Sequence, residues 1–167
     1  MGDKQFTNPT GAFGYTADGD VLGCVFAPFK VAESSSSAIT ILRGAIQQIT
    51  TSGTVLTVDT AQTDTILGVA LETVTVPDTD LIAASGQYSG PRTVDVVLYG
   101  LAQVLSGGTS QAFGVTLASN ASGQAIATTT ADGNYILGTA IEATGAVAGA
   151  LVTALIRPCR VEIHTLK

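Results

Sequence analysis

From residue 38 onward, apolar and polar residues alternate over short distances, which is the pattern of half-buried β-strands. The run "GTVLTVDT" at 53–60 alternates in this way, and "RTVDVVLYGLAQVL" at 92–105 is rich in β-branched and aromatic residues. Ser-Gly and Asp-Gly pairs interrupt the runs and favour turns. We therefore predict an all-β fold, a small barrel or sandwich with strands of about 5–7 residues. Only "DTDLIAASGQ" at 78–87 leaves room for a short helix.

One strand-forming sequence occurs twice in the chain. "ILGVALE" at 66–72 and "ILGTAIE" at 136–142 lie 70 residues apart. Each follows a strand, a Ser-Gly turn and a Thr-rich strand, and each precedes a further apolar strand. We predict two similar hairpin repeats, at about 44–100 and 113–158, that form one β-barrel-like domain over 38–167. Two repeats are too few for a solenoid but suffice for a pseudo-twofold domain with a shared core.

The glycine inside each repeated strand is unusual. A glycine within a strand marks a bulge or the close approach of another backbone. Neither copy has the glycine spacing of a phosphate-binding loop. We therefore assign a structural role to the repeated residues, which are Gly68, Ala70 and Glu72 in the first copy and Gly138, Ala140 and Glu142 in the second.

Residues 1–37 read differently from the rest. They hold five of the nine aromatic residues, set among Gly, Pro, Asn and Asp, and end in the Ser-rich joint "ESSSS" at 33–37. We predict an irregular arm, because this composition favours turns and loops. Aromatic side chains need a surface to bury against, either the protein's own domain or a neighbouring chain. The candidates for contact with a neighbour are Phe6, Phe13, Tyr15, Phe26 and Phe29.

Composition and charge limit the kinds of partner that the protein could bind. Charged residues make up only 12%, with none between Asp95 and Asp132, and Thr, Ser, Ala and Gly take their place. Such a surface suits either an assembly or a plain solvated β surface. The net charge is −6 and the basic residues are scattered, which argues against nucleic-acid binding. The apolar run at 143–156 is too short to span a membrane, and the first residues lack a signal-peptide pattern, so we expect a soluble protein made in the cytoplasm.

The sequence shows no recognisable catalytic, cofactor-binding or metal-binding motif. The single histidine, His164, has no evident partners, and Cys24 and Cys159 do not show metal-type spacing. The carboxylates that fall in turns lack the pattern of a calcium loop. We therefore predict a protein that is not an enzyme and has no cofactor.

The repeat resembles a known group. "AIQQITTSGTV", "ILGVALE" and "VDVVLYGLAQVL", followed by "GVTLASNASGQA" and "ILGTAIEATGAVAGALVTALIRP", resemble the small capsid-decoration (cement) proteins of tailed bacteriophages, over about 44–158. The resemblance implies a β-barrel-like domain, commonly trimeric, on the outer surface of the virion head. There it would clamp neighbouring major capsid proteins, after synthesis in the host cytoplasm. The aromatic arm is longer than the beginnings typical of that group.

Two interpretations follow. The first is a decoration protein bound as a homotrimer to the major capsid protein, through the aromatic arm or the barrel edge. The alternative is an adhesin or fibre-type β module that binds host-surface glycans. That module would need exposed aromatic residues on its loops, and those outside the arm are Tyr88, Tyr99, Phe113 and Tyr135. A hydrolase or lyase on a β scaffold lacks a site.

Overall fold

The computed structural model describes the chain in segments. These are 12–13 (backbone only), 24–34, 36–61, 65–77, 92–108, 111–128, 134–143 and 147–162. The strands are β1 (Ala12–Phe13), β2 (Cys24–Lys30), β3 (Ile39–Ile41), β4 (Ile46–Ile49), β5 (Val55–Thr57), β6 (Ile66–Ala70), β7 (Val74–Val76), β8 (Thr93–Gly107), β9 (Thr116–Ser119), β10 (Ala125–Ala127), β11 (Tyr135–Ala140) and β12 (Ala148–Arg160). The described residues form strands and no helix, and the fold is all-β, as predicted. The short helix considered at 78–87 lies outside them.

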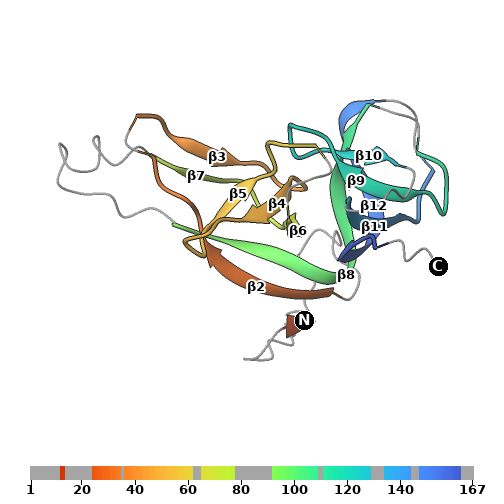
Figure 1. Ribbon diagram of the computed structural model, residues 1–167, viewed down its shortest axis with the longest axis horizontal. Helices are drawn as coiled ribbons and strands as arrows, with labels where there is room; N and C mark the ends of the chain where they lie inside the picture. The colour runs from red at the N-terminus through yellow and green to blue at the C-terminus, as the bar shows by residue number, and fades with distance from the viewer. Residues whose placement is uncertain are drawn as a thin grey trace, which may run out of the picture.

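The long strand β8 organises the molecule (Figure 1). Its first half pairs with β2 and β6, and its second half pairs with β12. In the second half, even-numbered residues point into the core and odd-numbered residues point outward. Val96 and Val97 are both buried, and the pairing with β2 slips by one residue just after them, between Val25 and Phe26. A bulge of this kind turns the strand, which lets one strand serve two curved sheets.

The second half of β8 belongs to a closed barrel. The strands run β8–β12–β11–β9–β10, and parallel pairing of Ala125 with Ser106 returns β10 to β8. We call this five-strand unit barrel 2. Closure leaves few open strand edges, which is how small β proteins avoid edge-to-edge association.

The first half of β8 belongs to a similar ring. The strands run β2–β8–β6–β4–β5, and Val31, directly after β2, makes a parallel bridge to Val55 in β5. The amide of Ala32 also donates to the carbonyl oxygen of Val55 at 2.9 Å. We call this ring barrel 1; the two parallel closures are equivalent because Val55 and Ala125 lie 70 residues apart. Figure 1 shows the two units side by side, joined through β8.

The two repeats make the same hydrogen bonds 70 residues apart. The amide of Gly44 donates to the carbonyl of Ala70, and that of Gly114 donates to the carbonyl of Ala140, both at 2.8 Å. Each barrel therefore consists of one repeat plus one preceding strand, which is β2 for barrel 1 and β8 for barrel 2. The repeats are joined in series by a shared strand, a feature that the local pattern did not reveal.

The segment 24–31 differs from the sequence-based expectation. It falls within the predicted irregular arm of residues 1–37, yet 24–30 form a regular strand paired with β8 over its whole length. Cys24 and Val31 are buried at its two ends. The prediction rested on the turn-rich composition of residues 1–37 as a whole and so included this strand. Its proline, Pro28, is tolerated because proline can occupy a strand position whose N–H the ladder does not need. The Ser-rich joint thus follows a core strand.

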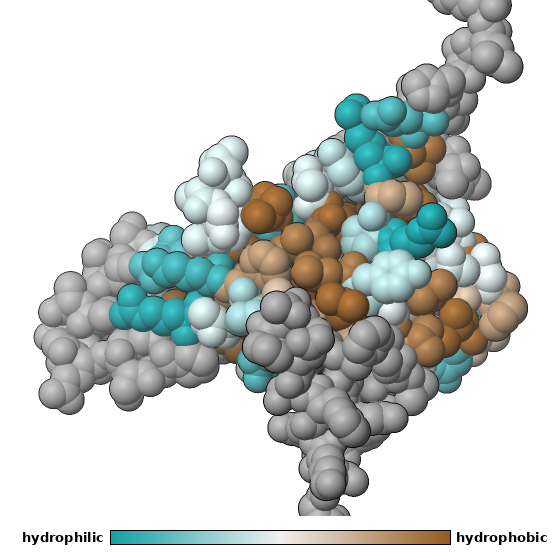
Figure 2. All heavy atoms as spheres, turned by 90° about the horizontal axis from the view of Figure 1, so that it is seen from below, coloured by the Kyte–Doolittle hydropathy of each residue, from teal (hydrophilic) through white to brown (hydrophobic). Residues whose placement is uncertain are grey.

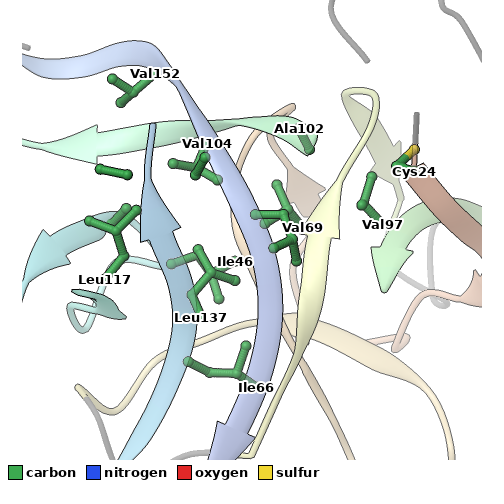
Figure 3. Close-up of a cluster of buried hydrophobic side chains, with 14 of the residues drawn as sticks. Cys24, Ile46, Ile66, Val69, Val97, Ala102, Val104, Leu117, Leu137 and Val152 are labelled. Atoms are coloured by element: carbon green, nitrogen blue, oxygen red, sulfur yellow. The ribbon is translucent and has the colours of Figure 1, made fainter. Parts of the chain in front are cut away.

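The core has two parts. One cluster fills barrel 2 and includes residues from both repeats, as Figure 3 shows for Ile46 and Val69 beside Leu117 and Leu137. The other cluster fills barrel 1. The separate two-stranded ribbon β3–β7 contributes Ile41, Val74 and Val76 to that second cluster.

Each barrel interior holds one buried glutamine at a different place. Gln47 in barrel 1 corresponds to Leu117 in barrel 2, whereas Gln111 in barrel 2 corresponds to Ile41 in barrel 1. The side-chain amide of Gln47 donates to the carbonyl of Ala45 at 3.0 Å, but its Oε1 has no donor among the described residues. An unpaired buried acceptor of this kind costs roughly 1–3 kcal/mol.

Gln47→Leu is expected to stabilise the protein by about 1 kcal/mol, because it removes the unpaired oxygen and adds apolar burial. The carbonyl of Ala45 keeps its hydrogen bond from the amide of Ala70. The measurement is urea unfolding followed by circular dichroism. The control is Leu117→Gln at the corresponding position, which should destabilise. A lower stability for Gln47→Leu would show that Oε1 has a hydrogen-bond donor in solution.

Candidate interaction surfaces

The described part of the chain shows no cluster of side chains typical of a metal centre. No group of three or more His, Cys, Asp or Glu residues there could hold a metal ion. Cys24 is buried in the core and Cys159 is exposed, and neither is in a disulfide. Within the same residues no helix is long and apolar enough to cross a membrane. His164 lies outside the described residues.

One small ion-pair cluster fastens the end of β2. Glu33 Oε1 lies 3.2 Å from Lys30 Nζ and 3.3 Å from Arg92 Nη1. The hydrogen bond from Lys30, together with the charges of Lys30 and Arg92, lowers the pKa of Glu33. Exposed pairs of this kind contribute little to stability. Their effect is to hold Glu33 beside the start of β8.

The repeated glycines lie where another backbone comes close. A Cβ atom on Gly68 would collide with the carbonyl oxygen of Val97 in β8, and one on Gly138 would collide with that of Leu155 in β12. The two contacts are equivalent in the two barrels. Ala70 and Ala140 are buried, two positions further along each strand. These four residues shape the barrel walls.

The two repeated glutamates, Glu72 and Glu142, have different surroundings. Oε2 of Glu142 accepts hydrogen bonds from the amide and the hydroxyl of Thr153, at 3.1 and 2.9 Å. These bonds lower the pKa of Glu142. The position equivalent to Thr153 in the first repeat is Asp95, a second carboxylate that cannot donate to Glu72 when ionised. Partial burial raises the pKa of Asp95, and Glu72 is exposed.

Thr153→Val is expected to raise the pKa of Glu142, because the hydroxyl donor is lost while the amide donor remains. The folded-state pKa lies below the ordinary 4.5, so this contact stabilises the fold above pH 4.5 and is lost as the pH falls through the folded-state pKa. The measurement is an NMR titration of the Glu142 carboxyl. Thr40→Val serves as the control, because the hydroxyl of Thr40 bonds to that of Thr75. An unchanged titration in Thr153→Val would contradict the assignment.

The aromatic candidates of the arm fall into two groups. Phe6 and Tyr15 lie outside the described residues, and of Phe13 only the backbone is described, paired with Val25. Phe26 and Phe29 are half-buried on β2 and pack against the two core clusters of the protein itself. For these two, the observed partner is the protein's own domain.

The wall of barrel 1 that faces barrel 2 is apolar and buried. We call it the outer wall of barrel 1; it consists of Ile46, Val58, Val69 and Val97, all of which join the core of barrel 2. The equivalent residues in barrel 2, which we call the outer wall of barrel 2, are Thr116, Thr128, Thr139 and Leu155, and all four are half-exposed. The contact between the repeats is therefore one-sided, which corrects the expectation of a pseudo-twofold pair.

A turn next to each wall differs in the same way. In turn 42–45 the carbonyl of Gly44 accepts from the amide of Leu105 at 2.9 Å, and Arg43 Nη2 donates to Gln103 Oε1 at 3.2 Å. This turn of barrel 1 thus sits on β8 in barrel 2. In the equivalent turn 112–115, Phe113 replaces Arg43 and its side chain is 74% exposed.

Apolar residues also gather on the face that contains β2 and β8. Figure 2 shows them over the middle of that face and toward its right-hand end, with polar residues gathered on the left and along the upper right edge. On these strands Val25 pairs with Tyr99, whose side chain is 54% exposed. Of the other aromatic residues considered for a glycan site, Tyr135 is half-buried against the core and Tyr88 lies outside the described residues.

No protein-family model matches the chain, and no curated protein does. Among solved structures, the chain is similar to one described as the crystal structure of head fiber gp8.5 N base in bacteriophage phi29. The TM-score is 0.53 at 18% identity, and the match covers 83% of this chain and 99% of that one. The likeness establishes the fold. At this identity it carries no residue from one protein to the other.

Sequence reasoning did not find the two outer walls or the paired turns. The signal was nonetheless present, because Ile46 and Val69 become Thr116 and Thr139 when the repeats are aligned. Replacement of apolar by polar residues at equivalent positions distinguishes a buried copy of a surface from a solvent-exposed copy. Only the structure shows which copy is covered.

Proposed function

We propose that this protein is a structural, non-enzymatic component of a tailed-phage head, attached to the outer capsid surface. The observation that carries the proposal is the fold likeness, which spans nearly the whole of a phage head-fibre base. The resemblance of the repeats to capsid-decoration proteins points to the same particle by an independent route. The described residues add two closed rings and no group of three or more His, Cys, Asp or Glu residues, an architecture suited to adhesion.

The mode of action that we propose is decoration. A decoration protein contacts adjacent major capsid proteins and stabilises their boundary, and many weak contacts add up when the lattice repeats them. A homotrimer would place such contacts around a local symmetry axis. The charge-poor surface supports this arrangement, because threonine-rich faces pack together without desolvating unpaired ions.

The test is co-sedimentation of the purified protein with empty heads of the parent phage. Stoichiometric pelleting supports the proposal, and failure to pellet at saturating concentration contradicts it. A variant that lacks residues 1–23 tests the arm, and we expect it to bind heads more weakly if Phe6, Phe13 and Tyr15 contact the capsid. The deletion must end before β2, because loss of 24–30 would open barrel 1. Unchanged binding by this variant would rule out the arm as a contact.

A second candidate function is a head-fibre module that binds host-surface glycans. The neighbour's description as a head fiber favours it, together with the exposed aromatic rings of Tyr99 and Phe113. Aromatic faces stack on apolar faces of ligands. Binding of the isolated protein to a glycan array or to host cells, with no pelleting on empty heads, would favour this candidate.

A further inference from the structure

We propose that the outer wall of barrel 2, together with turn 112–115, is the surface that seats the protein on its capsid partner, and that it takes an exposed β-strand carrying aliphatic side chains. This surface is called the docking face below. The inference rests on the proposed function and deepens it by naming the contact. It is drawn from the way in which barrel 1 already docks on barrel 2.

The internal contact shows what such a turn does. Gly44 lies at the third position of turn 42–45 with φ 79°, as a type II turn requires. Its carbonyl accepts from the amide of Leu105, and a Cβ atom there would press on the side chains of Leu105 and Leu151. The turn therefore satisfies a strand N–H and packs on a leucine pair, since Leu105 and Leu151 are opposite each other on β8 and β12.

The equivalent turn in barrel 2 keeps this geometry but has no such partner among the residues that the structure describes. Gly114 has φ 81°, and within the described segments a Cβ atom on it would meet nothing within 4 Å. The space beside its backbone is open where Gly44 meets two leucines. A second strand would fit there in the way that β8 fits against turn 42–45.

The residue changes between the two copies point to a partner and not to water alone. The last repeat of a tandem array is expected to become more polar on its free face. The wall follows this rule, since Ile46 and Val69 are replaced by Thr116 and Thr139. The turn reverses it, because charged Arg43 is replaced by Phe113, the most exposed of the large apolar side chains among the described residues. An exposed aromatic residue beside a polar rim is the usual composition of a separable interface.

In the part of the chain that the structure describes, a second copy offers no uncovered leucine pair of this kind. The positions in barrel 1 equivalent to the leucine pair are Lys30 and Thr93, which also lie opposite each other. Lys30 is charged and paired with Glu33. The leucine pair of barrel 2 is already in contact with turn 42–45. These residues favour a strand from a different protein as the occupant of the docking face.

The experiment measures the affinity of the full-length protein for empty parent heads by co-sedimentation over a concentration series. Phe113→Ser is expected to weaken binding about tenfold or more, as loss of an aromatic anchor does. Tyr99→Ser is the matched control, an exposed aromatic residue on another face, and should bind within about twofold of the unmodified protein. Both side chains are exposed, so both variants should fold, which thermal melting checks.

The outcomes separate this inference from the proposed function. If the unmodified protein does not pellet with heads, both are wrong. If it pellets and Phe113→Ser pellets equally well, the docking face is wrong and the proposed function stands. If sedimentation velocity shows an oligomer that Phe113→Ser converts to monomer, the occupant is a second copy and the capsid contact proposed here is overturned.

Discussion

Gly138→Ala and Gly68→Ala are each expected to destabilise the protein by at least about 3 kcal/mol, because the new Cβ would strike a backbone carbonyl oxygen that cannot move without breaking the barrel wall. For a chain of this size such a loss lowers the melting temperature by roughly 6–12 °C. The measurement is thermal and urea unfolding followed by circular dichroism. We expect the larger structural effect in the barrel that holds the substitution.

The control for this prediction is Gly53→Ala. Gly53 has φ 77° and open space beside it, so alanine there meets only the cost of the left-handed backbone, about 1 kcal/mol. The backbone of Gly68 is not in the left-handed region, so its cost measures the close approach alone. The explanation would be wrong if Gly68→Ala were no more destabilising than Gly53→Ala.

The second large effect is expected at the contact between the barrels. Ile46→Thr should cost about 2–4 kcal/mol and Val69→Thr about 1–3 kcal/mol, because each places a hydroxyl without a partner in a dry core. These substitutions give barrel 1 the residues that stand at the equivalent positions of barrel 2. The measurement is the free energy of unfolding from urea titration.

The reciprocal variants are the control. Thr116→Ile and Thr139→Val place the apolar residues of barrel 1 on the half-exposed wall of barrel 2, and their stability should change by less than about 1 kcal/mol. Equal costs in both directions would mean that the two walls have the same surroundings. That result would contradict the one-sided contact described above.

The one-sided contact also accounts for the differences between the two ends of the pair of barrels. Barrel 1 uses its outer wall and turn 42–45 to cover barrel 2, whereas the corresponding surface of barrel 2 carries threonines that tolerate water. At the opposite side, Lys30 and Thr93 stand where barrel 2 has leucines. Both ends of the tandem are thereby modified relative to the internal contact, as terminal units of repeat proteins are.

The sequence by itself determined the strands, the repeat and the special glycines. Alternation of apolar and polar residues is local, so it predicts strands without knowledge of their partners. The strand glycines could be assigned a close backbone approach because few other requirements place glycine there. The absence of recognisable catalytic motifs was likewise evident from the amino-acid sequence alone.

Only the tertiary structure decided which strands meet. Residues 24–31 were predicted to be part of an irregular arm because residues 1–37 as a whole have a turn-rich composition. They form a core strand because β8 supplies the partner that the local sequence lacks. The sharing of β8 between two rings, and the burial of one wall while its copy is half-exposed, depend on pairings between residues tens of positions apart. Barrel closure, and the burial of apolar side chains that it permits, determine which of these pairings form. Neither can be evaluated from the local sequence.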